Sequence, residues 1–110
     1  MLRIKRLIGP IGVIVSSLAG SHAWAQGQPE AGFALARQIC SECHAVEKAG
    51  ARSPNTAAPT FETIANVPGM TGAALSAALQ TSHRTMPNVM LDANELSNIV
   101  AYILSLRRAN

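Results

Sequence analysis

The chain has 110 residues, of which 48% are hydrophobic, and its Lys and Arg residues outnumber its Asp and Glu residues by nine to six. Three of the nine basic residues lie within the first 25 positions, so the six that remain are balanced by the six acidic residues. The net charge of the remaining chain therefore gives no support to nucleic-acid binding, and we expect no nucleic-acid partner.

Residues 1–25 have the pattern of a cleavable secretory signal peptide. The segment begins with Arg3, Lys5 and Arg6, continues through a mostly apolar run over residues 7–18, and ends in the small-x-small sequence Ala23-Trp24-Ala25. The apolar run is shorter than the ~20 residues that a membrane-spanning helix requires, which disfavours a retained membrane anchor. We therefore predict cleavage after Ala25 and export to the periplasm, which leaves residues 26–110 as one small domain.

The first predicted helix begins at Pro29 and Glu30, because proline suits the first turn of a helix and glutamate suits the positive end of its dipole. Apolar residues then recur at helical spacing and form one stripe: Gly32, Leu35, Ala36 and Ile39. This stripe leads directly into a short cysteine motif.

The motif is Cys40-Ser41-Glu42-Cys43-His44, and Cys-x-x-Cys-His is the signature of covalent c-type haem attachment. On a helical turn, Cys40 lies three residues before Cys43 and four before His44, so all three side chains project towards one region. Two thioether bonds can then hold the haem while the imidazole binds its iron. A thioredoxin-like dithiol, half a zinc site and a short-loop disulfide are the alternatives. The chain has only two cysteines and shows no strand-helix alternation around them, which disfavours all three.

Gly, Ser, Pro, Asn and Ala dominate residues 48–59, which predicts a long loop. Residues 60–67 have the pattern of a short helix that ends before Pro68-Gly69, and Thr71 is positioned to cap a further helix that extends to about Gln80.

The last predicted helix begins with Asp92 and Glu95, which have the spacing of a capping box. Apolar residues follow at helical spacing: Leu96, Ile99, Val100, Ile103 and Leu104. Arg107 and Arg108 are expected in its last turn, where cations favour the negative end of the dipole. No segment has a clear strand pattern, so the predicted fold class is all-α. A domain this small needs support beyond its own core, which a bound haem would provide.

A haem iron bound by His44 on one face needs a second axial ligand for pure electron transfer. Four residues of the mature chain are candidates from the residues alone: Met70, Met86, Met90 and His83. Met86 is the preferred candidate because it lies between two predicted helices and is followed by Pro87, which stiffens the backbone. Any of these methionines can instead be a packing residue, and the site can also lack a sixth ligand.

The chain resembles the small bacterial class I cytochromes c over residues 29–108. The matching pieces are Gly32 and Phe33, Cys40-Ser41-Glu42-Cys43-His44, Ala58-Pro59-Thr60-Phe61, Thr85-Met86-Pro87-Asn88, and Tyr102. The resemblance implies the cytochrome c fold, with three to five short helices wrapped around one covalently bound haem c per chain.

The same resemblance implies roles for individual residues. Cys40 and Cys43 attach the haem, His44 and Met86 bind the iron, and the Pro59 carbonyl accepts a hydrogen bond from His44 Nδ1. Gly32 would let the first and last helices cross closely near Tyr102. Many family members hold a haem propionate with a Trp and a Tyr in the middle of the chain, which this mature chain lacks. Candidate substitutes are Arg52, Asn55 and His83.

The predicted function is that of a periplasmic electron-transfer protein, not an enzyme in itself. Its expected partners are redox proteins that meet the exposed haem edge, with membranes reached only through partner complexes. The protein is expected as a monomer or as a subunit of a complex. The alternative is a cytochrome c subunit of a larger periplasmic dehydrogenase or sulfur-compound oxidase. A gas sensor or peroxidase would require that Met86 does not bind the iron.

Overall fold

The structure is a computed structural model that describes residues 26–49, 51–83 and 85–109. The predicted signal peptide, residues 1–25, lies outside the described residues. Within the described ranges the chain forms four helices and no strand, which confirms the predicted all-α class. The helices are α1 (Pro29–Ile39), α2 (Phe61–Ala65), α3 (Gly72–Leu79) and α4 (Ala93–Ser105).

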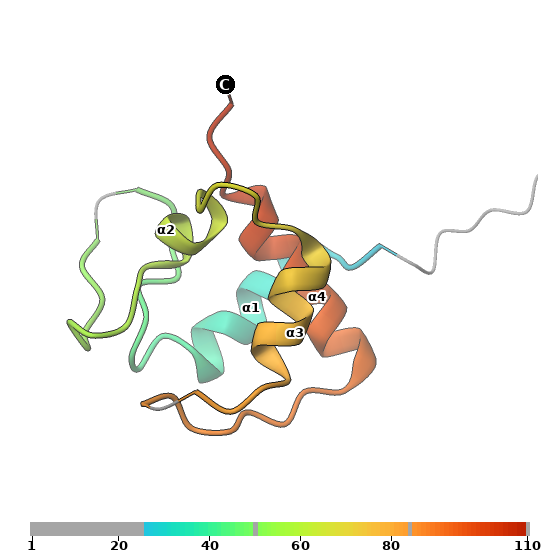
Figure 1. The fold of residues 1–110 in the computed structure, drawn as a ribbon, viewed down its shortest axis with the longest axis horizontal. Helices are drawn as coiled ribbons and strands as arrows, with labels where there is room; N and C mark the ends of the chain where they lie inside the picture. The colour runs from blue at the N-terminus through green and yellow to red at the C-terminus, as the bar shows by residue number, and fades with distance from the viewer. Residues whose placement is uncertain (1–25, 50, 84, 110) are drawn as a thin grey trace, which may run out of the picture.

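The first and last helices form the centre of the fold, where α1 crosses α4 and α3 packs against the same helix (Figure 1). Gly32 is buried at this crossing, and a Cβ added to it would lie 2.0 Å from the carbonyl oxygen of Asn98 and 2.8 Å from the Cβ of Tyr102. The backbone N–H of Gln28 also donates to Asn98 Oδ1 at 2.8 Å. The close crossing expected at Gly32 is therefore present, and it depends on the missing side chain.

Aromatic side chains continue the core away from this crossing. The ring of Tyr102 lies 5.0 Å from that of Phe33 and 6.4 Å from that of Phe61, measured between centroids. The Tyr102 hydroxyl donates a hydrogen bond to the Val46 carbonyl, which joins α4 to the segment after the cysteine motif. Burial and the nearby Glu47 carboxylate raise the pKa of Tyr102 above its ordinary value. The remaining buried apolar residues of the core are Ala36, Val46, Ala65, Leu75, Ile99, Ile103 and Leu106.

The helix starts agree with the capping residues seen in the sequence. The Thr71 side chain accepts from Ala74 N at the start of α3, as its position predicted. Helix α2 has a cap that was not predicted, since the Thr60 side chain accepts from Thr63 N. The capping box before α4 is complete, because Asp92 accepts from the backbone of Glu95 and the Glu95 carboxylate accepts from the backbone of Asp92. These contacts satisfy N–H groups that the helices leave without internal partners.

Two expectations about helix ends were wrong. Helix α2 is shorter than the 60–67 segment, because Thr60 is its cap and the chain leaves the helix at Asn66 before turning at Gly69, whose φ is +76°. Helix α4 ends at Ser105, so Arg107 and Arg108 lie beyond its last turn.

The chain after α4 is bound to the end of α2 instead of continuing the helix. Arg107 donates to the carbonyls of Ala65, at 3.3 Å, and of Met70. Asn66 accepts from the backbone N–H of Arg108 at 3.0 Å. These carbonyls bind Arg107 directly, which replaces the interaction with the helix dipole that the sequence suggested.

Candidate functional site

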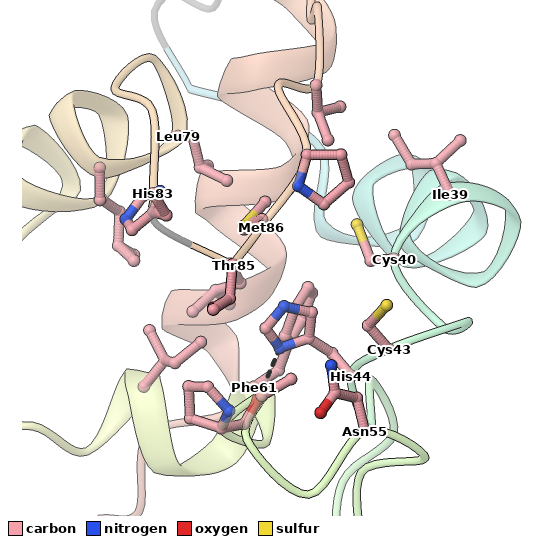
Figure 2. Close-up of a pocket in the computed structure, with 18 of the residues that line it drawn as sticks. Ile39, Cys40, Cys43, His44, Asn55, Phe61, Leu79, His83, Thr85 and Met86 are labelled. Carbon is pink, nitrogen blue, oxygen red and sulfur yellow. Dashed lines mark hydrogen bonds between the residues drawn. The ribbon is translucent and has the colours of Figure 1, made fainter.

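The cysteine motif forms a turn directly after α1. The backbone N–H of Cys43 donates to the Cys40 carbonyl at 3.2 Å, and that of His44 donates to the same carbonyl at 2.9 Å. These are the i→i+3 and i→i+4 bonds of a helical turn, which the spacing of the motif predicted. Cys40, Cys43 and His44 line one pocket, and Figure 2 shows both sulfur atoms on the same side of it.

The segment after the motif is a long loop, as predicted, and it folds back against the motif. Asn55 N donates to the Cys43 carbonyl at 3.1 Å, and Phe61 N donates to the Ala45 carbonyl at 3.0 Å. Ser53 is buried and its hydroxyl accepts from Ala45 N at 3.0 Å. The motif is thus fixed from both sides, by α1 before it and by this loop after it.

His44 is oriented by a backbone carbonyl of the same loop. Its Nδ1 lies 2.6 Å from the Pro59 carbonyl oxygen, the contact that the resemblance implied (Figure 2). A carbonyl only accepts, so Nδ1 is the donor, and in the neutral ring the lone pair then lies on Nε2. The ring also packs 5.5 Å from the ring of Phe61 between centroids. His44 is therefore held in the tautomer that binds a metal through Nε2.

The pocket beside His44 has a volume of about 300 Å³. Its walls are largely apolar, and they come from α1, α2, α3, α4 and the loops between them, with side chains that include Ile39, Phe61, Ile64, Leu75, Leu79 and Ile103. Among the described residues that line it there is no Asp, Glu, Lys or Arg. Ile39, the last residue of the predicted apolar stripe, is 41% exposed because it lies at the pocket and not in the interface between helices.

The four candidates for the distal ligand differ in their position relative to the pocket. Met86, Met70 and His83 line the pocket, whereas Met90 does not and is 91% exposed. In the view of Figure 2 the loop with Met86 passes above the ring of His44. Met70 adjoins the apolar core, which is the position of an ordinary packing methionine. Met86 and His83 therefore both combine a loop position with access to the pocket, and Met86 is the one followed by a proline.

The three candidates for contact with a haem propionate also differ in their position. Asn55 and His83 line the pocket, and Arg52 does not. The Asn55 side chain accepts from Ala57 N at 3.0 Å, which leaves its amide N–H groups free of this contact.

Three alternative uses of the cysteines find no support in the structure. Burial raises the pKa of the Cys40 thiol to about 11, whereas redox-active dithiols have thiols of low pKa. Both cysteines are free, so they form no disulfide. In the part of the chain that the structure describes, no three His, Cys, Asp or Glu side chains gather to bind a metal ion as in a zinc site.

The volume, the apolar lining and the donors of the pocket fit a haem. Cofactor pockets measure about 300–1,000 Å³ and are mostly apolar with a few polar groups. Here two thiols and an imidazole lie at one wall, and a thioether lies on the loop over the other. Cys40 and Cys43 would be the residues to form the thioether bonds, and His44 and Met86 would be the candidates to bind the iron.

An all-α fold with Cys-x-x-Cys-His at the wall of an apolar pocket is that of a small cytochrome c. The chain belongs to the family described as cytochrome C oxidase, cbb3-type, subunit III, whose model matches residues 27–103. Comparisons with curated proteins and with solved structures found no match. The cytochrome c domain implies haem c binding and electron transfer through the haem.

Some residues of the site were not found from the sequence. Ser53 holds the motif through Ala45, yet it is one of several small polar residues in a loop and nothing distinguishes it. A hydrogen bond between Ser82 and Asn88, on the loop of Met86, was also missed, because side-chain pairs across an irregular loop leave no periodic signal.

No helix within the described ranges has both the length and the apolar character needed to span a membrane.

Proposed function

We propose that this chain is a periplasmic electron-transfer protein with one covalently attached haem c, bound through His44 and Met86. Residues 1–25 act as the signal peptide, and cleavage after Ala25 releases the domain. The observation that carries the proposal is the pairing of Cys-x-x-Cys-His with a histidine whose Nδ1 donates to Pro59 and whose Nε2 is left to bind iron.

A bound haem supplies one-electron chemistry, with iron that alternates between the ferrous and ferric states. The chain sets the conditions for this chemistry. His44 keeps one orientation through Pro59, and a Met86 thioether in the distal position favours ferrous iron. The apolar wall of the pocket, without a charged side chain among its described residues, disfavours the additional charge of ferric iron. Both effects raise the potential. With both axial positions filled, no substrate binds the iron, which suits an electron carrier and not a catalyst.

A second candidate is a haem subunit of a larger oxidoreductase complex. The family description, which names an oxidase subunit, favours it. The axial ligands and pocket are the same in both cases, so the two differ in their partners. Redox partners are expected to meet the exposed haem edge through a small, transient contact, or a lasting one in a complex.

Mass spectrometry of the protein from the periplasmic fraction tests the proposal. The expected mass is that of residues 26–110 plus one haem, and acid-acetone extraction should leave the haem with the polypeptide. A bare chain, or haem that is extracted, would overturn the attachment. Reversible oxidation and reduction by one electron, with slow carbon monoxide binding by the ferrous protein, is expected of a carrier. Rapid carbon monoxide binding would instead indicate an open-site sensor or enzyme.

A further inference from the structure

The segment that joins α3 to α4 carries Met86 and has little backbone support. Between residues 82 and 91, the described residues form no backbone hydrogen bond with one another or with the rest of the fold. Helix α3 ends before this segment, with Gln80 as its cap, and α4 begins after it, at the Asp92 cap. Something other than a helix or a ladder must hold the Met86 side chain at the pocket.

One side-chain hydrogen bond crosses this segment. The Ser82 hydroxyl donates to Asn88 Oδ1 at 2.9 Å, between residues on either side of Met86. The side chains of the other described residues in this segment form no further hydrogen bond. It closes a short loop, which removes conformations in which Met86 would swing away from the pocket.

Pro87 restricts the same loop from within. Its ring fixes its own φ and disfavours the helical region for Met86, the residue before it. The loop of Met86 is thus stiffened at one internal position and closed by one hydrogen bond. A proline restricts only local geometry, so the position of the whole loop depends on its closure.

We propose that Ser82 and Asn88 are positioning residues that hold the Met86 thioether at the distal face of the haem. The inference rests on the proposed His44 and Met86 ligation and deepens it. Without the hydrogen bond, the loop gains conformations in which the sulfur is away from the iron. One hydrogen bond is modest in net worth, so its loss should raise the population of the open form by roughly three- to tenfold without abolishing Met86 binding.

The test compares Ser82→Ala with Thr81→Val in the haem-loaded protein. Thr81 is the adjacent residue and also exposed, but its hydroxyl donates to Ala77 O within the α3 end, at 2.6 Å, and does not cross the loop. The first readout is the rate at which the ferrous protein binds carbon monoxide, which requires the sulfur to leave. The second is the near-infrared sulfur-to-iron band of the ferric protein. Ser82→Ala should bind carbon monoxide roughly three- to tenfold faster, and Thr81→Val should match the unmutated protein.

Asn88 provides the partner half of the test. Asn88→Ala should reproduce the effect of Ser82→Ala, and the double variant should be no faster than either single variant, because both remove one contact. Asn88→Asp retains the accepting oxygen and should restore a rate near that of the unmutated protein. Equal thermal unfolding midpoints across the series would show that the faster binding is not general loosening of the fold.

The outcomes separate this inference from the proposal it depends on. If the unmutated ferric protein lacks the sulfur-to-iron band, the ligation by Met86 is wrong and the positioning role falls with it. If the band is present and Ser82→Ala and Asn88→Ala bind carbon monoxide at the unmutated rate, the ligation stands and the positioning role is overturned. A Thr81→Val variant as fast as Ser82→Ala would also overturn it.

Discussion

Gly32 and Asn98 lie in direct backbone contact where α1 crosses α4, so close that a Cβ on residue 32 would come within 2.0 Å of the Asn98 carbonyl oxygen. Neither helix can shift at this point alone, because an added Cβ would meet the backbone of Asn98 and also the Cβ of Tyr102. The distance between the two helices is therefore set by the absence of one side chain.

Gly32→Ala should destabilise the holoprotein by about 2 kcal/mol or more, because forcing the helices apart costs more than the ~1 kcal/mol that alanine contributes through helix propensity. Thermal or denaturant unfolding measures this. Gly72→Ala is the matched control in α3, where a Cβ would meet Val100 and Leu104 side chains at ordinary distances of 3.5 and 3.7 Å. That variant should be neutral or slightly more stable, and equal losses at the two positions would contradict the crossing.

His44→Ala should prevent the accumulation of normal low-spin holoprotein, because no other imidazole adjoins the cysteines in the motif. His83→Ala is the comparison, since His83 lines the same pocket from the loop over the other side. Visible absorption spectra of the two purified variants decide between them. A native spectrum in His44→Ala together with a lost one in His83→Ala would reverse the assignment of the axial histidine.

Met86→Ala should remove the near-infrared sulfur-to-iron band, lower the potential and allow rapid carbon monoxide binding, because water or nothing replaces the sulfur donor. Met90→Ala should leave all three unchanged and alter the free energy of unfolding by less than about 0.5 kcal/mol, since the Met90 side chain is 91% exposed. Optical spectra and potentiometric titration measure both variants. The opposite pattern would move the distal ligand to Met90.

Tyr102 should make the protein less stable at alkaline pH. Its pKa is raised above the ordinary 10, so the folded state favours the neutral phenol that donates to Val46. Stability is complete below the pKa of the unfolded chain, and it is lost as pH rises through that value to the higher pKa of the folded state. Because Tyr102 is the single tyrosine, phenolate absorbance reports its ionisation alone.

Tyr102→Phe tests the same group. The variant should lose about 1–2 kcal/mol near neutral pH with the hydrogen bond, and this part of the alkaline loss should disappear. Unfolding curves for both proteins across the alkaline range give the comparison. An identical alkaline loss in the two proteins would show that another group is responsible.

The sequence predicted those parts of the fold that have a local cause. Thr71 and the Asp92–Glu95 pair identify helix starts because caps act within one turn, and the Gly32–Ile39 stripe follows from helical period. The end of α4 was predicted wrongly because Arg107 binds the carbonyls of Ala65 and Met70, which are distant in the chain. The same holds for the site. Cys40, Cys43 and His44 lie within five consecutive residues and were recognisable, whereas the Ser82–Asn88 contact depends on a loop without regular structure.

The hydrogen bond between His44 and Pro59 has a consequence for protons. The acceptor is a backbone carbonyl, which has no ionisable proton, and Pro59 itself has no N–H to offer a competing contact. In the proposed state, with Nε2 on iron, the imidazole cannot exchange its Nδ1 proton with an acidic or basic neighbour through this bond. The Pro59 carbonyl would therefore orient the imidazole of His44 without placing a second titrating group beside it.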